Sequence, residues 1–86
     1  MRDHADCAIV FPPSINPKLR RWLRRIAVPT LVLWGAGDRI VSPAYGRAYA
    51  EAIPGSRFEL IERAGHRPEL ERPEAFVERI VAFLKE

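Results

Sequence analysis

The chain has 86 residues, of which 48% are hydrophobic and 29% are charged, and its formal net charge is +3. This length limits it to one small domain or a part of a larger one, and the composition is ordinary for a soluble globular protein. The single cysteine, Cys7, excludes an internal disulfide and fits a reducing cytoplasm. Twelve of the 14 basic residues are arginine, which we interpret as the mark of a GC-rich bacterial coding sequence.

The first residues lack the basic start and apolar run of a signal peptide. No apolar stretch approaches the length of a membrane span. We therefore expect a cytoplasmic protein without a membrane partner.

Residues 1–15 show no clear periodicity and predict an irregular N-terminal segment. The apolar run Ala8–Phe11 is stopped by two prolines, and we interpret it as a loop or the end of a preceding element. The spacing of His4 and Cys7 suggests a metal site, but two ligands without a second pair fall short of a closed zinc site. We expect no metal there.

A helix is predicted at about 17–26, with Asn16 as the N-cap and proline at its first position. Its apolar residues recur with helical spacing at Leu19, Trp22, Leu23 and Ile26. Five cations cover the rest of this helix and could indicate nucleic acid or an anionic membrane as a partner. We favour a solvated face and expect no nucleic acid, because no second basic element or interleaved aromatic residue accompanies the cations.

A buried strand is predicted at about 30–34, where large apolar residues follow one another without alternation. Gly35 and Gly37 allow a sharp turn after it, and Asp38 then lies just past the carboxyl end of the strand. Ligands and reactive groups gather at this edge of open α/β sheets. Trp34 could line a pocket or fill the core, and we favour the core.

The next helix is predicted at about 43–52, with Ser42 as its N-cap and Pro43 at its first position. Its expected packing face consists of Ala44, Tyr45, Ala48, Tyr49 and Ala52. Ser42 as a nucleophile would need a nearby base and an exposed, strained turn, so we favour the N-cap role.

A second strand is predicted at about 57–62, where Phe58 and Leu60 alternate with charged residues, so one face should meet solvent. The connection between the strands is too long for a hairpin and indicates a parallel βαβ unit. Asp38 and His66 would then lie on the same edge of the sheet, where a carboxylate can orient an imidazole and stabilise its protonated form. Glu69 and Glu71 could raise the proton affinity of His66 if they lie near it, although solvent exposure is the simpler expectation.

The last helix is predicted at about 73–85, beginning at Pro73 and carrying a wide apolar stripe. The fold class is therefore α/β, with two parallel strands (about 30–34 and 57–62) and three helices (about 17–26, 43–52 and 73–85). Two strands make a marginal sheet, so the chain is expected to be a part of a larger domain.

Two motifs in this order resemble the carboxyl-terminal part of an α/β-hydrolase-fold enzyme. The run PTLVLWGAGDRIV is similar to the segment with the triad acid of that family, and AGHRPELERPEAF to the segment with its catalytic histidine. The run NPKLRRWLRRIAVP resembles the helix that leads from the cap region, so the resemblance extends over residues 16–86. It implies that Asp38 is the triad acid and His66 the general base.

The G-x-S-x-G elbow, which holds the nucleophile in that family, is absent from this sequence. The resemblance therefore implies a carboxyl-terminal fragment of a serine-type hydrolase of ester or related bonds, which has no cofactor and is inactive as an isolated chain. Its partners would be an ester-like small molecule in the complete protein and the upstream half of the domain. The alternative is a non-catalytic remnant that serves as an interaction or self-associating module.

Overall fold

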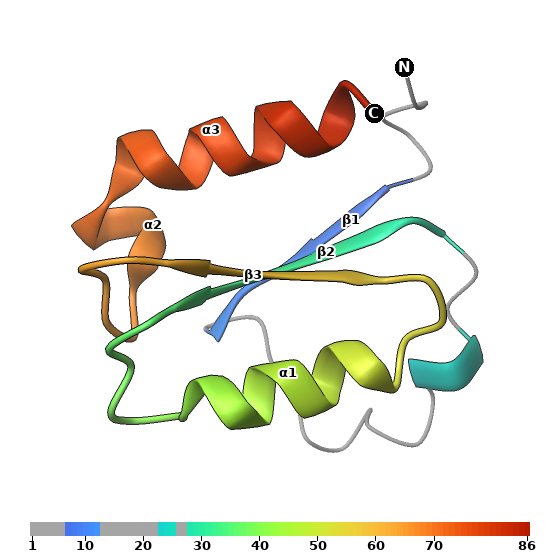
Figure 1. The fold of residues 1–86 in the computed structure, drawn as a ribbon, viewed down its shortest axis with the longest axis horizontal. Coiled ribbons are helices and arrows are strands. Elements are labelled where there is room, and N and C mark those ends of the chain that lie inside the picture. The colour runs from blue at the N-terminus through green and yellow to red at the C-terminus, as the bar shows by residue number, and fades with distance from the viewer. Residues whose placement is uncertain (1–6, 13–22, 26–27) are drawn as a thin grey trace.

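The computed structural model describes residues 7–12, 23–25 and 28–86. In this part of the chain, one parallel sheet has the strand order β1-β2-β3, with β1 at Ala8–Val10, β2 at Thr30–Gly35 and β3 at Arg57–Ile61. The helices are α1 (Pro43–Glu51), α2 (Pro68–Glu71) and α3 (Pro73–Leu84). The carboxyl ends of the strands point to one side of the molecule, where α2 and the loops after β2 and β3 lie (Figure 1).

The α/β class, the parallel strands and the helices predicted at about 43–52 and 73–85 are confirmed. The prediction of two strands is wrong, because the apolar run interpreted as a loop or the end of a preceding element forms a third strand, β1, within the segment expected to be irregular. Three residues are too few to show a strand period, and β1 is defined by its pairing with β2, where Ala8 lies opposite Thr30 and Val10 opposite Val32. The short helix α2 was also not predicted.

The helix predicted at 17–26 lies largely outside the described residues. Of that range, the structure describes residues 23–25, which form a single 3₁₀ turn. Leu23 in this turn is 2% exposed and packs with Tyr49 and Ile53 of the α1 region.

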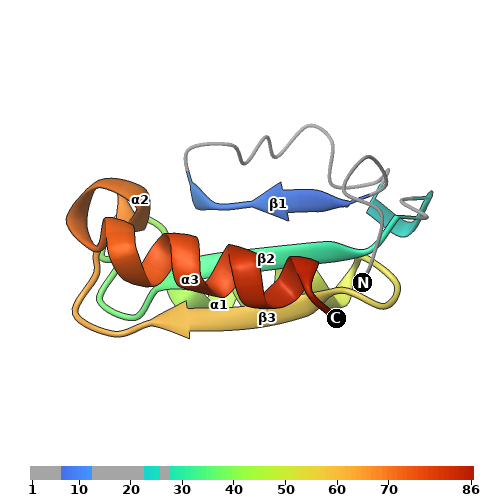
Figure 2. The ribbon, with the colours of Figure 1, turned by 90° about the horizontal axis from the view of Figure 1, so that it is seen from above.

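Strand β2 is the centre of the molecule, and all of its residues are buried. Because side chains alternate across a strand, Leu31 and Leu33 pack on the side of α3, whereas Val32 and Trp34 pack on the side of α1. Figures 1 and 2 show α1 and α3 on opposite faces of the sheet. Burial on both faces explains why the sequence of β2 is continuously apolar.

Trp34 belongs to the core, as favoured from the sequence, and is 0% exposed. Helix α1 approaches its indole at Gly46, where an added Cβ would lie 2.4 Å from a ring carbon. The expected packing face of α1 was wrong in part, because Ala44 and Ala48 are exposed while Gly46, Tyr49 and Ala50 are buried. The helix turns its glycine to the sheet because only glycine leaves room for the indole there.

The prediction that one face of β3 meets solvent holds in part, because Arg57 is exposed whereas Glu59 is half-buried. Phe58 and Leu60 pack on the side of α1, and α3 crosses the other face. There the Arg79 Nη1 donates to Glu59 Oε1 at 2.9 Å and to the carbonyl of Leu60 at 3.3 Å. Glu59 is therefore bound to the neighbouring helix, whereas Arg57 stays exposed and pairs with Glu59 and Glu86.

Candidate active site

The backbone after β2 turns at two glycines and packs directly on the loop after β3. A Cβ added at Gly35 would lie 2.1 Å from the carbonyl oxygen of Gly65 and 2.6 Å from that of Ala64. The N–H of Gly37 donates to the carbonyl of Ala64 at 2.9 Å. Because both contacts are to backbone atoms, any side chain at position 35 would force the two loops apart.

Asp38 lies just past this turn, and its side chain is completely buried. Its Oδ1 accepts hydrogen bonds from the backbone N–H groups of Ile40 and Val41, both at 2.9 Å. Its Oδ2 lies 3.1 Å from Nδ1 of His66. The buried carboxylate thus has a partner for each oxygen, as burial of a polar group requires.

The loop that holds Asp38 is also tied to the core. The indole N–H of Trp34 donates to the carbonyl of Val41 at 2.9 Å. Since Trp34 is fully buried, this bond fixes the far end of the turn that the Asp38 carboxylate organises. The position of the acid therefore follows from β2 and the turn that ends at Val41.

His66 follows β3 through a turn in which Arg63 adopts a left-handed backbone conformation, with φ of 61°. The His66 side chain is 27% exposed, so one edge of the ring is accessible. An ionised carboxylate can only accept hydrogen bonds, so the proton of the neutral ring belongs on Nδ1, which faces Asp38. The Nε2 atom then keeps its lone pair, which is the state required of a general base.

The two residues singled out in the sequence, Asp38 and His66, are therefore brought into hydrogen-bond contact by the structure. They come from the ends of adjacent parallel strands, as the predicted βαβ unit requires. The carboxyl ends of β2 and β3 meet at the same edge, and the glycine turn brings their loops together. The catalytic roles that the resemblance implies for the two residues stay predictions at this point.

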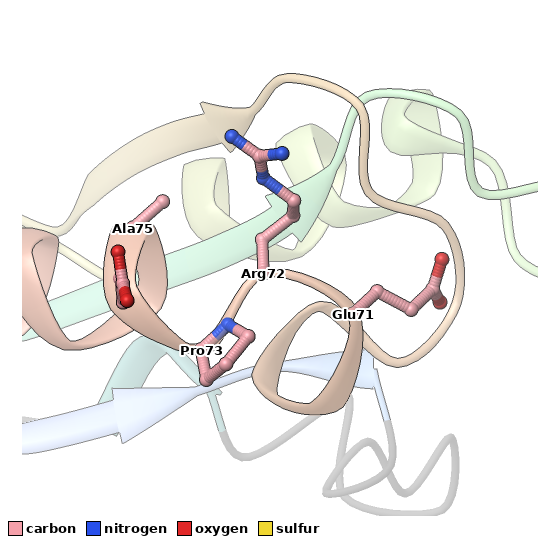
Figure 3. Close-up of a pocket in the computed structure, with 5 residues that line it drawn as sticks. Glu71, Arg72, Pro73 and Ala75 are labelled. Carbon is pink, nitrogen blue, oxygen red and sulfur yellow. The ribbon is translucent and has the colours of Figure 1, made fainter.

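A third residue, Glu71, belongs to this region and is exposed, as expected from the sequence. Its Oε1 accepts from the N–H of Gly65 and its Oε2 from the N–H of Arg67, each at 3.0 Å. In Figure 3 the Glu71 side chain extends from α2 to the loop after β3. Glu69, by contrast, pairs with the guanidinium of Arg67 at 2.6 Å. The sequence signal for this contact was a glutamate five residues after the histidine. Its partners are backbone N–H groups, and these cannot be recognised from residue types.

A surface hollow of about 230 Å³ lies beside this region at the junction of α2 and α3. Its lining residues are Glu71, Arg72, Pro73, Glu74 and Ala75 (Figure 3). Neither Asp38 nor His66 lines it, so we do not assign it as the substrate site.

Other residues considered from the sequence lie away from the Asp38–His66 contact or outside the described residues. Ser42 is at the N-cap position of α1, as predicted, although its hydroxyl makes no capping hydrogen bond. His4 lies outside the described residues. Within residues 7–12, 23–25 and 28–86, no three His, Cys, Asp or Glu side chains gather as metal ligands. The same residues include no helix with the length and apolar character needed to cross a bilayer.

Comparison with known proteins shows the family to which this chain belongs. The sequence profile of the α/β hydrolase fold matches residues 9–73. A 2-hydroxy-6-oxononadienedioate/2-hydroxy-6-oxononatrienedioate hydrolase of Cupriavidus pinatubonensis is 37% identical over 96% of this chain. The match covers 30% of that relative. The chain thus spans about 30% of the length of that hydrolase.

Two solved structures have a similar fold. A hydrolase from Thermoplasma acidophilum superposes with a TM-score of 0.83 and 38% identity, covering 92% of this chain and 38% of that chain. An esterase from Thermogutta terrifontis superposes with a TM-score of 0.76 and 39% identity, covering 80% of this chain and 25% of that chain. The sequence profile, the relative and the structures agree, and the chain belongs to the α/β-hydrolase fold family.

Proposed function

We propose that this chain is the carboxyl-terminal part of a serine-type α/β-hydrolase that acts on ester or related bonds. Asp38 is the triad acid and His66 the general base, while the nucleophile comes from the upstream part of the domain. The observation that carries this proposal is the 3.1 Å contact between Asp38 Oδ2 and His66 Nδ1, formed by a fully buried carboxylate and a partly exposed ring.

In the proposed reaction, His66 Nε2 takes the proton of the serine hydroxyl as its oxygen attacks the acyl carbon. The resulting imidazolium is stabilised by Asp38, whose remaining oxygen stays bound to the N–H groups of Ile40 and Val41. His66 then gives the proton to the leaving alkoxide, takes one from water, and returns it to the serine when the acyl-enzyme is cleaved. Upstream backbone N–H groups hold the oxyanion.

The upstream part of the domain is the proposed partner. Among the described residues, β1 pairs with β2 alone, so its second edge is available for a further strand. The side chains of β1 are only partly buried. We propose that an upstream strand extends the sheet at this edge and that the upstream part completes the site for an ester-like substrate.

The test is a chimera with the Thermogutta terrifontis esterase, in which the matching carboxyl-terminal segment is replaced by that of this chain. We expect hydrolysis of 4-nitrophenyl butyrate that falls by at least about 10³-fold on His66→Gln. Circular dichroism and size exclusion establish that both proteins are folded. A folded chimera without activity, or with activity that is indifferent to His66, would contradict the proposal.

The alternative of a self-associating remnant is favoured by the apolar residues on the outer side of α3, where Val77 is 55% and Val81 41% exposed. Light scattering of the 86-residue chain separates the two proposals. A stable oligomer that is dispersed by Val77→Lys would favour self-association. A monomer would contradict self-association, and the hydrolase proposal would be the one that remains.

A further inference from the structure

The loop with His66 is held by a carboxylate outside the acid–base pair. The two oxygens of Glu71 accept hydrogen bonds from the N–H groups of Gly65 and Arg67, so one side chain binds the backbone on both sides of His66. We propose that Glu71 is a positioning residue that directs the His66 ring towards Asp38. This inference rests on the proposed function of the Asp38–His66 pair.

The need for such a residue follows from how the loop is attached. Its first part is fixed, because Ala64 is buried and its carbonyl accepts the N–H of Gly37. Beyond Ala64, the hydrogen bonds that the structure gives for the N–H groups of Gly65 and Arg67 both end on Glu71. Without that carboxylate, these two N–H groups would turn to water, and the backbone beside His66 would be held only through the carbonyl of Arg67, which accepts from the N–H groups of Leu70 and Glu71.

Glu71 is itself well anchored. It is the last residue of α2, between Pro68, which begins α2 and is buried, and Pro73, which begins α3. Each proline fixes one backbone dihedral angle at the start of its helix. The carboxylate is therefore presented from a short rigid element rather than from a free loop.

Gly65 provides the space for this contact. A Cβ at position 65 would lie 3.2 Å from Glu71 Oε1 and 3.3 Å from Oε2, closer than ordinary contacts. A side chain there would push the carboxylate away from the two N–H groups. The glycine and the glutamate are thus two parts of one arrangement.

Glu69 offers a comparison, because it is a carboxylate on the same helix and even nearer to His66 in sequence. It binds the side chain of Arg67 and makes no hydrogen bond to the backbone around His66. If only negative charge near the ring mattered, Glu69→Gln and Glu71→Gln would have similar effects. The proposal predicts that only Glu71 affects the ring.

The experiment is nitrogen-15 NMR of the chain with labelled histidine, in which His66→Gln identifies the signals of His66 against those of His4. The wild-type ring should be protonated at Nδ1, with a downfield Nδ1 proton. In Glu71→Ala we expect a mixture of ring tautomers and loss of that proton signal, with amide exchange at Gly65 and Arg67 at least about tenfold faster. Glu71→Gln keeps one acceptor oxygen and should be intermediate, and Glu69→Gln should match wild type.

Slow exchange of the β2 and β3 amides shows in each variant that the fold is intact. A folded Glu71→Ala chain with the wild-type tautomer and Nδ1 proton would overturn the proposal, even if its loop amides exchange faster. If Glu71→Ala fails to fold, Glu71→Gln decides by the same criterion. Asp38→Asn separates the two proposals: an unchanged His66 signal in that variant would refute the acid–base pair itself, whereas a signal lost in Asp38→Asn and kept in both Glu71 variants would refute the positioning role alone.

Discussion

The loop after β2 carries Asp38, whose carboxylate binds N–H groups of the same loop, whereas the loop after β3 carries His66, whose neighbours are bound by a side chain from α2. Asp38 is fully buried and binds the N–H groups two and three residues further on. His66 is partly exposed, and its neighbours are bound by Glu71. A buried carboxylate that organises its own turn contributes to stability, so Asp38 has a structural role besides the proposed catalytic one.

The largest effect is expected for Asp38→Asn in the esterase chimera. The asparagine oxygen can still accept from Ile40 and Val41, but its amide cannot accept the Nδ1 proton of His66, so the wrong ring tautomer is favoured. We expect kcat for 4-nitrophenyl butyrate to fall by about 10⁴-fold, with little change in stability. Glu78→Gln, an exposed change on α3, serves as the control. A variant that keeps a tenth of the rate would show that the pair does not act as proposed.

Gly35→Ala tests the contact between the two loops. Its Cβ would collide with the backbone oxygens of Ala64 and Gly65, which cannot move without displacing β3. The free energy of unfolding in urea should fall by about 3 kcal/mol or more. At Gly37 an added Cβ would lie 3.3 Å from Ala64 O, so Gly37→Ala should cost less than about 1 kcal/mol. Equal losses would mean that the loops are not packed as described.

Asp38→Ala and His66→Ala compare the two loops directly. The alanine at 38 leaves the N–H groups of Ile40 and Val41 without their acceptor, so we expect a loss of about 2 kcal/mol in the free energy of unfolding. Because His66 is partly exposed, His66→Ala should lower the free energy of unfolding by less than about 1 kcal/mol. Urea unfolding followed by circular dichroism gives both values, and a larger loss for His66→Ala would reverse the comparison.

The smallest effect is expected at Arg63, where a residue with a side chain adopts φ of 61°. Glycine removes the steric cost of that conformation but adds chain entropy to the unfolded state, so Arg63→Gly should raise the free energy of unfolding by about 0.5 kcal/mol. The opposite change is Gly55→Ala, at φ of 71°, where an added Cβ would meet no atom within 4 Å. It should lower the free energy of unfolding by about 1 kcal/mol, because alanine is strained in that conformation. Thermal unfolding of both variants measures the difference, and a loss of stability in Arg63→Gly would argue against strain at this turn.

Much of the fold could be predicted because the relevant signals are local. The continuous apolar run of β2 indicates burial on both faces, and the Ser-Pro start of α1 together with its length indicates a crossover helix. Parallel strands then bring their carboxyl ends to one edge, which is why Asp38 and His66 could be paired from sequence. Strand β1 was missed because three residues have no recognisable period and its strand form comes from pairing with β2.

The sequence by itself determined the order of the elements and the two residues that follow adjacent strand ends, since strand burial, helix starts and glycine turns act over a few neighbouring residues. Only the tertiary structure decided which face of α1 meets Trp34, that Arg79 pairs with Glu59, and that Glu71 binds the backbone around His66. Each of these depends on the direction of a side chain towards a distant partner. That direction is fixed by packing between elements, which residue order alone does not specify.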